Sequence, residues 1–216
     1  MIRPVMASLI QPFLALPAYG LAALVVLLLY ALQSELRFGR RARTMFAGPS
    51  DRGSSLVLSA SAVIPVLGFV MVMKAPAWSF FDRLPFWLWA PDSLPGMPSV
   101  AWVGVGLGIA GLGMRLWAVL TLRQRYTRTL LVDEAHSIER GGPYRLVRHP
   151  GYLGSLLCLN GIALATGNAF VFAASIVATF AAYAYRIRVE DAMLTAAFGP
   201  AYEDYRREVN AVIPFL

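Results

Sequence analysis

The chain has 216 residues, of which 58% are hydrophobic and only 14% are charged. This composition excludes an ordinary soluble domain and indicates an integral membrane protein. A formal charge of +7 would suggest nucleic-acid binding in a soluble protein, but here the arginines lie mainly beside apolar segments, where membrane topology accounts for them. We therefore expect a lipid bilayer as a partner and no nucleic acid.

Five apolar segments predict five transmembrane helices. The first runs from Leu14 to Gln33, and its 20 residues correspond to about 30 Å of helix, the thickness of the hydrocarbon layer. It is too long for the core of a signal peptide, so we expect it to be retained. The last two are short and are separated only by the polar turn Thr166-Gly167-Asn168, which predicts a helical hairpin. The four segments after the first are Ser55 to Met73, Val100 to Leu122, Tyr152 to Thr166 and Ala169 to Tyr185.

The segment from Ala75 to Ser99 separates the second and third apolar segments. It contains five prolines together with Trp78, Trp87 and Trp89, a composition that resists long helices and favours the membrane interface. A role for the tryptophans in substrate binding is possible, but anchoring at the lipid boundary is the simpler explanation. We interpret the segment as an external interfacial loop.

Positive charge predicts the orientation of the bundle. Of the 19 Lys and Arg residues, 15 follow the first or third apolar segment or lie in the C-terminal tail. Loops rich in Arg and Lys stay on the cytoplasmic side. The sequence therefore predicts an external N-terminus, a cytoplasmic C-terminus and an odd number of spans. We expect a multi-pass protein of a bacterial inner membrane.

Two patterns suggest functions that the context argues against. Gly106, Gly108 and Gly111 form a Gly-x-Gly-x-x-Gly pattern, but a dinucleotide-binding turn needs a preceding strand, and these glycines lie inside an apolar helix. Gly104 and Gly108 also form a Gly-x-x-x-Gly pair, which favours close helix packing. The single cysteine, Cys158, can form neither an internal disulfide nor a metal-binding cluster, so we expect no metal site.

Arg115 lies inside the third apolar segment. A cation at that depth is costly and usually faces a polar partner or cavity. Alternatively, its long side chain can reach the cytoplasmic boundary, because Leu122 at the end of the segment is only about 10 Å away along the helix. The sequence leaves both interpretations open.

The peptide from Gly142 to Tyr152 places Arg145, Arg148 and His149 at the mouth of the fourth segment. His149-Pro150 is typical of a helix start, whose free backbone N–H groups can receive a carboxylate. The peptide therefore predicts a site for a polar ligand at the membrane surface. A loop that only fixes topology is the alternative.

Arg186 and Glu190 share one helix face where the fifth segment ends. They form either a surface ion pair or a pair of opposite charges that can grip one zwitterionic ligand. Farther on, Tyr202, Tyr205 and Val209 recur at helical spacing. This amphipathic stretch could cover the site, but we favour an ordinary helix on the membrane surface.

Together these motifs resemble the isoprenylcysteine carboxyl methyltransferase family over roughly the second half of the chain. The first two apolar segments match that family only as hydrophobic helices. The resemblance rests on spacing as well as residue type. Its motifs are Arg115-Leu-Trp117-Ala118, Gly142-Pro-Tyr-Arg-Leu-Val-Arg-His149-Pro-Gly-Tyr152-Leu-Gly, Arg186-x-x-x-Glu190-Asp191-x-x-Leu194, Phe198-Gly199, Tyr202, Tyr205 and Pro214.

The resemblance implies an all-α integral membrane methyltransferase with a cytoplasmic cofactor-binding loop and a C-terminal helix. It would form one domain, residues 1–216, with two N-terminal helices and the external loop in 1–99 and the methyltransferase-like half in 100–216. The enzyme would take S-adenosylmethionine from the cytosol and methylate a lipophilic small molecule or lipidated substrate, with the carboxylate of an isoprenylcysteine-like compound as first candidate.

The resemblance also implies roles for individual residues. Glu190 would bind the amino-acid end of the cofactor, and Arg186 would lie near the acceptor or the cofactor. Arg186 or Arg115 could orient an anionic acceptor and so serve as a catalytic residue. The family often has two glutamates where this chain has Glu190 followed by Asp191, which leaves the role of Asp191 open. The residues expected to border the cofactor are Tyr144, Val147, Arg148, His149, Tyr152 and Leu153.

Other functions stay open at this point. Phospholipid N-methyltransferases and thiol S-methyltransferases look similar in the cofactor region. Membrane reductases of the sterol-reductase type, which use NADPH, have a broadly similar Arg-His-x-x-Tyr segment. A transporter would predict paired broken helices or an inverted repeat, and we find neither in the sequence. The sequence fixes neither the acceptor nor the oligomeric state.

Overall fold

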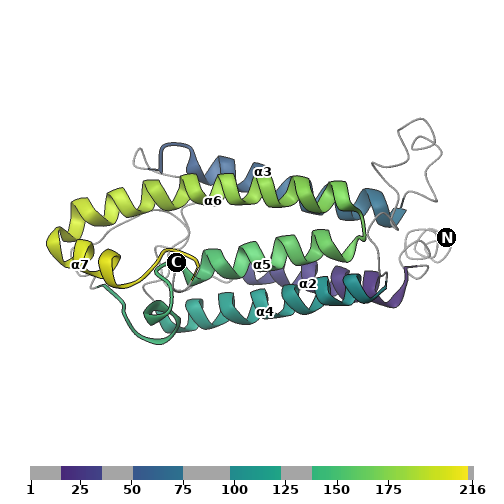
Figure 1. The fold of residues 1–216 in the computed structure, drawn as a ribbon, viewed down its shortest axis with the longest axis horizontal. Helices are drawn as coiled ribbons and strands as arrows, with labels where there is room; N and C mark the ends of the chain where they lie inside the picture. The colour runs from purple at the N-terminus through teal and green to yellow at the C-terminus, as the bar shows by residue number, and fades with distance from the viewer. Residues whose placement is uncertain (1–15, 36–50, 75–97, 123–137, 214–216) are drawn as a thin grey trace, which may run out of the picture.

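A computed structural model describes residues 16–35, 51–74, 98–122 and 138–213 of the chain. Within these ranges the secondary structure is entirely helical, which confirms the predicted fold class. Five long helices run along the long axis of the molecule, and a short one turns back at one end (Figure 1). The helices are α2 (Ala18–Glu35), α3 (Ser54–Lys74), α4 (Ser99–Leu122), the 3-10 helix η8 (Gly142–Arg145), α5 (Pro150–Ala165), α6 (Ala169–Phe198) and α7 (Pro200–Glu208).

Each of the five predicted apolar segments falls on one of the long helices. Three helices, α3, α4 and α6, are long and apolar enough to cross a membrane on their own. The apolar parts of α2 and α5 are shorter, at Ala18–Gln33 and Pro150–Ala165. Large apolar side chains are exposed along the bundle, including Leu32, Leu56 and Val177. A surface of this kind needs lipid around it, so the chain is an integral membrane protein.

Helix α6 continues well beyond Tyr185, where the fifth apolar segment was predicted to end. Helix α6 contains 30 residues and ends at Phe198, which corresponds to about 45 Å of helix. Its last part carries Arg186, Glu190 and Asp191, and no helix-breaking residue interrupts it before Gly199-Pro200. The charged residues therefore continue the helix instead of ending it.

Glycines bring α4 and α5 into backbone contact. A Cβ atom added at Gly111 would lie 2.5 Å from the carbonyl oxygen of Gly154, and one at Gly104 would lie 2.5 Å from that of Gly161. One at Gly108 would lie 2.8 Å from a methyl group of Val26 on α2. Close helix packing by Gly104 and Gly108 is therefore confirmed. The glycines do not act as one motif, because a Cβ at Gly106 would meet nothing within 4 Å.

The turn between α5 and α6 confirms the predicted helical hairpin. Gly167 adopts a φ of 68°, and the side chain of Asn168 caps α6 by accepting a hydrogen bond from the backbone N–H of Val171 at 2.9 Å. Farther along the hairpin, the Asn160 amide donates to the Thr179 hydroxyl at 3.0 Å and accepts from the Ser175 hydroxyl at 2.9 Å. These bonds fix the register of the two helices.

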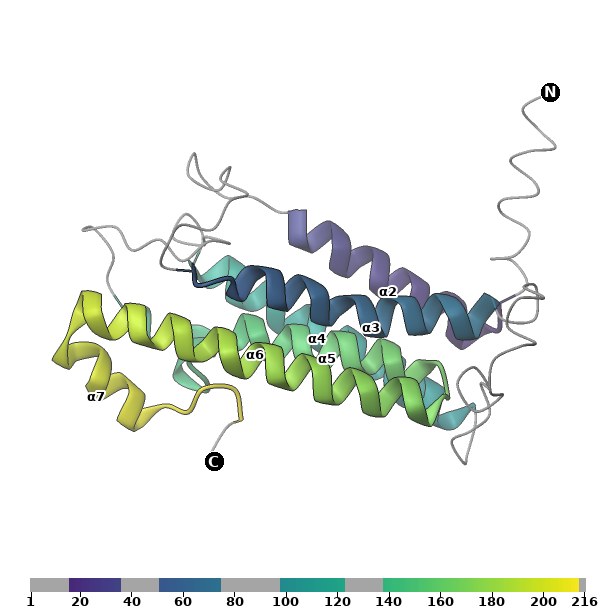
Figure 2. The ribbon, with the colours of Figure 1, turned by 90° about the horizontal axis from the view of Figure 1, so that it is seen from above.

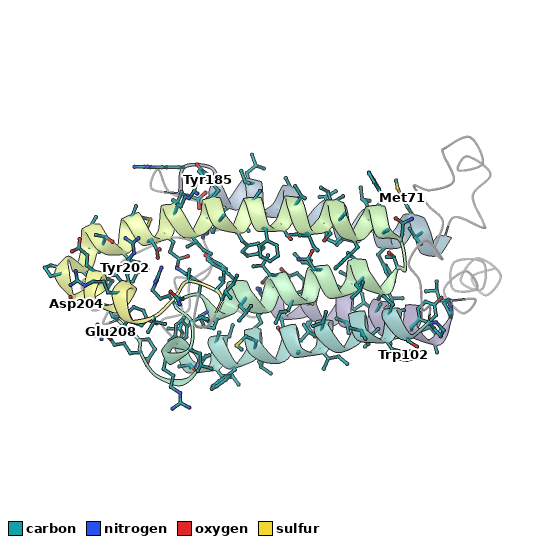
Figure 3. The ribbon with its side chains drawn as sticks, viewed as in Figure 1. Met71, Trp102, Tyr185, Tyr202, Asp204 and Glu208 are labelled. Carbon is teal, nitrogen blue, oxygen red and sulfur yellow. The ribbon has the colours of Figure 1, made fainter. Side chains whose placement is uncertain are left out.

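The core lies where α2, α3, α4 and α5 meet, and α6 packs along α3 (Figures 1 and 2). Cys158 is fully buried in this core. Met71 and Trp102 lie at one end of the bundle, and Tyr202, Asp204 and Glu208 lie at the other (Figure 3). This second end carries the C-terminal tail and the charged turn, which is the stretch from Gly142 to His149 before α5.

Much of the sequence that predicts the orientation of the bundle lies outside the described residues. The external loop with Trp78, Trp87 and Trp89 falls there, as do Leu14 and most arginines of the two basic loops. The external position of that loop and the direction of insertion therefore stay predictions.

Candidate functional site

The charged turn begins with η8, which packs on the end of α4. Gly142 adopts a φ of 54°, and a Cβ there would lie 2.9 Å from the Thr121 hydroxyl, so the close approach of the turn to α4 requires a glycine. Pro143 and Val147 are buried beneath the turn. As predicted, His149 is the N-terminal cap residue of α5 and Pro150 occupies its first turn.

The C-terminal segment covers this turn. The backbone N–H groups of Arg148 and His149 donate to the carbonyls of Asn210 and Ala211 at 2.8 and 2.9 Å. The Tyr205 hydroxyl donates to the carbonyl of Tyr144 at 2.5 Å. These contacts correct our preference for a helix on the membrane surface, because α7 turns its tyrosines toward the charged turn.

The guanidinium of Arg148 also binds the C-terminal segment. It donates to the carbonyls of Val209 and Arg206, the latter at 3.1 Å. Outside this contact, Arg140 bonds the carbonyl of Ala201 at 3.1 Å and pairs with Glu208 at 3.0 Å. Loop and tail therefore form one polar unit at the end of the bundle.

Asp191 is the centre of that unit, a role that the sequence did not reveal. Its carboxylate accepts hydrogen bonds from the Tyr202 hydroxyl at 2.6 Å and from Arg148 at 3.2 Å, and it lies 3.0 Å from Nε2 of His149. The side chain is only 8% exposed. Asp191 thus joins the charged turn, α6 and α7, and the only sequence signal was its place beside Glu190.

Glu190 lies next to this centre and is more accessible, with 24% of its side chain exposed. The Tyr152 hydroxyl donates to Oε2 of Glu190 at 2.5 Å, and Nδ1 of His149 lies 3.8 Å from the same oxygen. The rings of His149 and Tyr152 stack with their centroids 5.3 Å apart. The fold therefore brings four of the predicted site residues together: Arg148, His149, Tyr152 and Glu190.

Arg186 belongs to the same network but is fully engaged inside the protein. Its Nε donates to the Tyr152 hydroxyl at 3.0 Å, and its Nη1 donates to the Asp51 carboxylate and to the Ser54 hydroxyl, the latter at 2.6 Å. Its side chain is 4% exposed. The predicted ligand carboxylate for Arg186 is here replaced by an internal one, Asp51, which no motif indicated.

Arg115 points to a partner within the bundle. Its Nη1 donates to the Ser155 hydroxyl of α5 at 2.7 Å, and its guanidinium lies 5.0 Å from the ring centre of Tyr30 on α2. These contacts favour the interpretation with a polar partner over a side chain that reaches for the boundary. Ser155 follows Tyr152 by three residues on α5, so Arg115 lies about one helical turn deeper than the charged network.

The remaining predicted residues lie around this network. Tyr144 and Leu153 are partly exposed, whereas Val147 is completely buried. The cofactor contacts of all three stay predictions. In the described parts of the chain, no group of three or more His, Cys, Asp or Glu side chains could hold a metal ion.

Burial fixes the protonation of the tyrosines on α7. It raises the pKa of Tyr205 to about 12. For Tyr202, burial and the hydrogen bond to Asp191 together raise the pKa well above its ordinary value of 10.0. Both hydroxyls therefore keep their protons at physiological pH and act as hydrogen-bond donors.

Comparison with known proteins finds sequence relatives of this chain. Residues 100–201 match the model of the phospholipid methyltransferase family. The chain is 31% identical over 127 residues to protein-S-isoprenylcysteine O-methyltransferase A of Arabidopsis thaliana, which covers 56% of this chain and 64% of the relative. It is 34% identical over 122 residues to the cobalt-zinc-cadmium resistance protein CzcN of Cupriavidus metallidurans, covering 56% of this chain and 51% of that protein. The matches thus span less than two thirds of the relatives.

The fold has a solved counterpart as well. The structure of the eukaryotic intramembrane Ras methyltransferase ICMT (isoprenylcysteine carboxyl methyltransferase) aligns with a TM-score of 0.59 and 23% identity, over 73% of this chain and 53% of that one. The network residues that lie inside the region matching the family model are Arg148, His149, Tyr152, Arg186, Glu190 and Asp191. Their partners Asp51, Ser54, Ser55, Tyr202 and Arg206 lie outside it. The chain is thus similar in sequence to isoprenylcysteine O-methyltransferases over about half of its length, and its fold is similar to that of a solved isoprenylcysteine carboxyl methyltransferase.

Proposed function

We propose that the chain is an S-adenosylmethionine-dependent membrane methyltransferase whose acceptor is lipophilic. The carboxylate of an isoprenylcysteine-like compound is the first candidate acceptor. The supporting observation is the meeting of the turn Arg148-His149 with the carboxylates of Glu190 and Asp191. These four residues lie within residues 100–201, the region that matches the phospholipid methyltransferase family model.

The charges of the network suit the amino-acid end of S-adenosylmethionine, which carries an ammonium and a carboxylate. Glu190 is a partly exposed carboxylate that can meet the ammonium. At the start of α5, where Pro150 has no N–H to donate, the backbone N–H of Gly151 can receive the carboxylate beside His149. When bound, the cofactor supplies a methyl group on a positively charged sulfur, ready for in-line displacement.

The chain itself needs to supply position and environment more than proton transfer. An anionic acceptor requires alignment and loss of water to attack a methyl group, and no general base has to act. The apolar bundle provides a low dielectric that strengthens attraction between opposite charges. Arg115 is the residue that we propose to orient the acceptor anion. Arg186, which is held by Asp51 and Tyr152, is proposed to lie near the cofactor. Tyr144, Val147 and Leu153 are proposed to shape the cofactor surface.

Transfer of label tests the proposal directly. The purified protein is incubated in detergent with S-adenosylmethionine labelled in its methyl group and a panel of lipid acids, amines and thiols. We expect label in an isoprenylcysteine acid, and the Glu190→Gln variant should transfer much less. Absence of label in every acceptor, together with binding of NADPH, would support the membrane reductase instead.

Phospholipid N-methylation is the second candidate, because the matching family model is that of phospholipid methyltransferases. The amine members of the same panel decide this point. Label in a phosphatidylethanolamine headgroup and none in the acid would assign the chain to that reaction. Label only in a thiol would assign it to S-methylation.

A further inference from the structure

A buried ion pair joins the two halves of the chain. Arg186 on α6 and Asp51, just before α3, are 135 positions apart, yet their side chains pair while only 4% and 2% exposed. Asp51 lies outside residues 100–201, the region that matches the family model. The N-terminal half thus contributes a charged side chain to a network whose other charged residues lie in the second half.

The turn that carries Asp51 holds its carboxylate in a fixed position. Arg52 adopts a φ of 47°, which is unfavourable for a residue with a side chain and persists only where surrounding contacts impose it. One such contact comes from Tyr185, whose hydroxyl donates to the carbonyl of Arg52 at 2.8 Å. The carboxylate itself accepts from the Ser54 hydroxyl at 3.0 Å and from the backbone N–H and hydroxyl of Ser55 at 3.0 and 2.9 Å.

These contacts keep Asp51 ionised. Burial raises the pKa of its carboxyl, but the hydrogen bonds from Ser55 and Ser54 and the charge of Arg186 outweigh burial, so the pKa lies below its ordinary value of 3.8. At neutral pH the carboxylate is charged and balances the guanidinium beside it.

Arg186 needs this balance because a second carboxylate lies within its reach. Glu190 follows Arg186 by four residues on α6, a spacing at which the two side chains can pair. In the structure Tyr152 stands between them, accepting from Arg186 Nε at 3.0 Å and donating to Glu190 at 2.5 Å. Without a charge at position 51, the guanidinium would be drawn toward Glu190 and would neutralise it.

We propose that Asp51 is a positioning residue of the cofactor site. It holds Arg186 on the α3 side of Tyr152 and so leaves the charge of Glu190 for a cationic ligand. This inference rests on the proposed function, since the cationic ligand is taken to be the ammonium group of S-adenosylmethionine.

Binding of S-adenosylmethionine by the full chain in detergent, measured by calorimetry, tests the inference. Asp51→Asn should weaken binding about tenfold, a typical effect for the loss of a coupled charge. Asp51→Glu should recover part of the affinity. The control Asp204→Asn removes an exposed carboxylate at the same end of the bundle and should bind as the unchanged protein does.

A second background separates positioning from a merely structural role. If Asp51 acts by holding Arg186, then Asp51→Asn should change the affinity less than twofold once Arg186→Gln is present, because no cation is left to hold. An equal loss in both backgrounds would overturn the inference. Wild-type affinity in Asp51→Asn, even with a lower melting temperature, would overturn it too.

Two further outcomes are covered by the design. If Asp51→Asn does not fold, Ser55→Ala replaces it, because it removes one of the hydrogen bonds that hold the Asp51 carboxylate. The affinity for S-adenosylmethionine should then fall two- to threefold, roughly the effect of losing one partly exposed hydrogen bond. Unchanged affinity would overturn the inference. If the unchanged protein does not bind S-adenosylmethionine, the proposed function fails and the inference fails with it.

Discussion

Two neighbouring carboxylates on α6 lie in different environments. Asp191 is buried and faces three donors, Tyr202, Arg148 and His149. Glu190 is three times as exposed, at 24% against 8% for the side chains, and accepts from Tyr152. A residue that must meet a ligand has to be reachable, whereas one that holds a loop has to be satisfied from within. The geometry therefore suggests a binding role for Glu190 and a structural role for Asp191.

The first prediction concerns Glu190. Glu190→Gln keeps the shape of the side chain and its contact with Tyr152 but removes the charge that we assign to the cofactor ammonium. We expect affinity for S-adenosylmethionine to fall about 10- to 100-fold, the effect of losing one charge-assisted bond, with little change in melting temperature. Calorimetry and thermal unfolding in detergent measure both, and Glu203→Gln on the exposed face of α7 is the control. Unchanged affinity would remove Glu190 from the site.

The second prediction concerns Asp191. Asp191→Asn leaves Arg148 buried beside a neutral amide, and breaking a buried pair from one side costs about 3–5 kcal/mol. Tyr202→Phe removes only one hydrogen bond and should cost about 1 kcal/mol. In thermal unfolding in detergent, the melting temperature of Asp191→Asn should therefore lie well below that of Tyr202→Phe. The opposite order would show that Asp191 is not the centre of the network.

Sequence could predict those site residues whose geometry is local. His149 beside Pro150 marks a helix start, and Arg186 with Glu190 share a face by spacing alone. The Asp51 partner of Arg186 could not be found in this way, since a separation of 135 positions is closed only by the packing of α3 on α6. The bond from Tyr202 to Asp191 could not be predicted either, because it depends on the direction in which α7 turns at Gly199.

At the scale of the elements, hydropathy placed all five long helices, but it marked the end of the apolar part of α6 and not the end of the helix. The prediction stopped at Tyr185, where apolar residues give way to Arg186. Backbone hydrogen bonding does not stop with hydrophobicity, and the true end comes at Gly199, with a φ of 56°, followed by Pro200. The extra turns matter because they carry both carboxylates out to the charged turn.

The third prediction tests the contact between α4 and α5. A Cβ at Gly111 would lie 2.5 Å from the Gly154 carbonyl oxygen and 2.6 Å from the Cys158 amide nitrogen, and backbone atoms cannot yield without moving the helices apart. Gly111→Ala should destabilise the bundle by about 1–3 kcal/mol. Gly106→Ala is a matched control on the same helix, because its Cβ meets nothing within 4 Å, and it should be neutral or slightly stabilising. Equal unfolding curves for the two variants in detergent would contradict the packing.

At the scale of the whole molecule, helices of the N-terminal half pack against the half that carries the motifs. Only the second half carries the family motifs, yet α3 supplies the surroundings of Asp51, and Tyr30 of α2 lies against Arg115. Helices α3 and α6 pack together, as do α2 and α4. We therefore propose that residues 1–216 form one domain, with 1–99 supporting the methyltransferase-like half in 100–216.

The last prediction concerns the direction in which this domain crosses the membrane. Five spans and basic loops predict an external N-terminus and a cytoplasmic C-terminus. Cys158 is fully buried, so a cysteine introduced at an exposed position should react with little background. Pro98 lies just before α4 and Asp204 on α7, and both are exposed. In intact bacterial cells a membrane-impermeant maleimide should label Pro98→Cys, whereas Asp204→Cys should react only after permeabilisation. Labelling of both variants from the same side would require an even number of crossings between them and would contradict the five-span topology. The reverse pattern would mean that the bundle is inverted. The charged network would then lie outside the cytosol, away from the pool of S-adenosylmethionine.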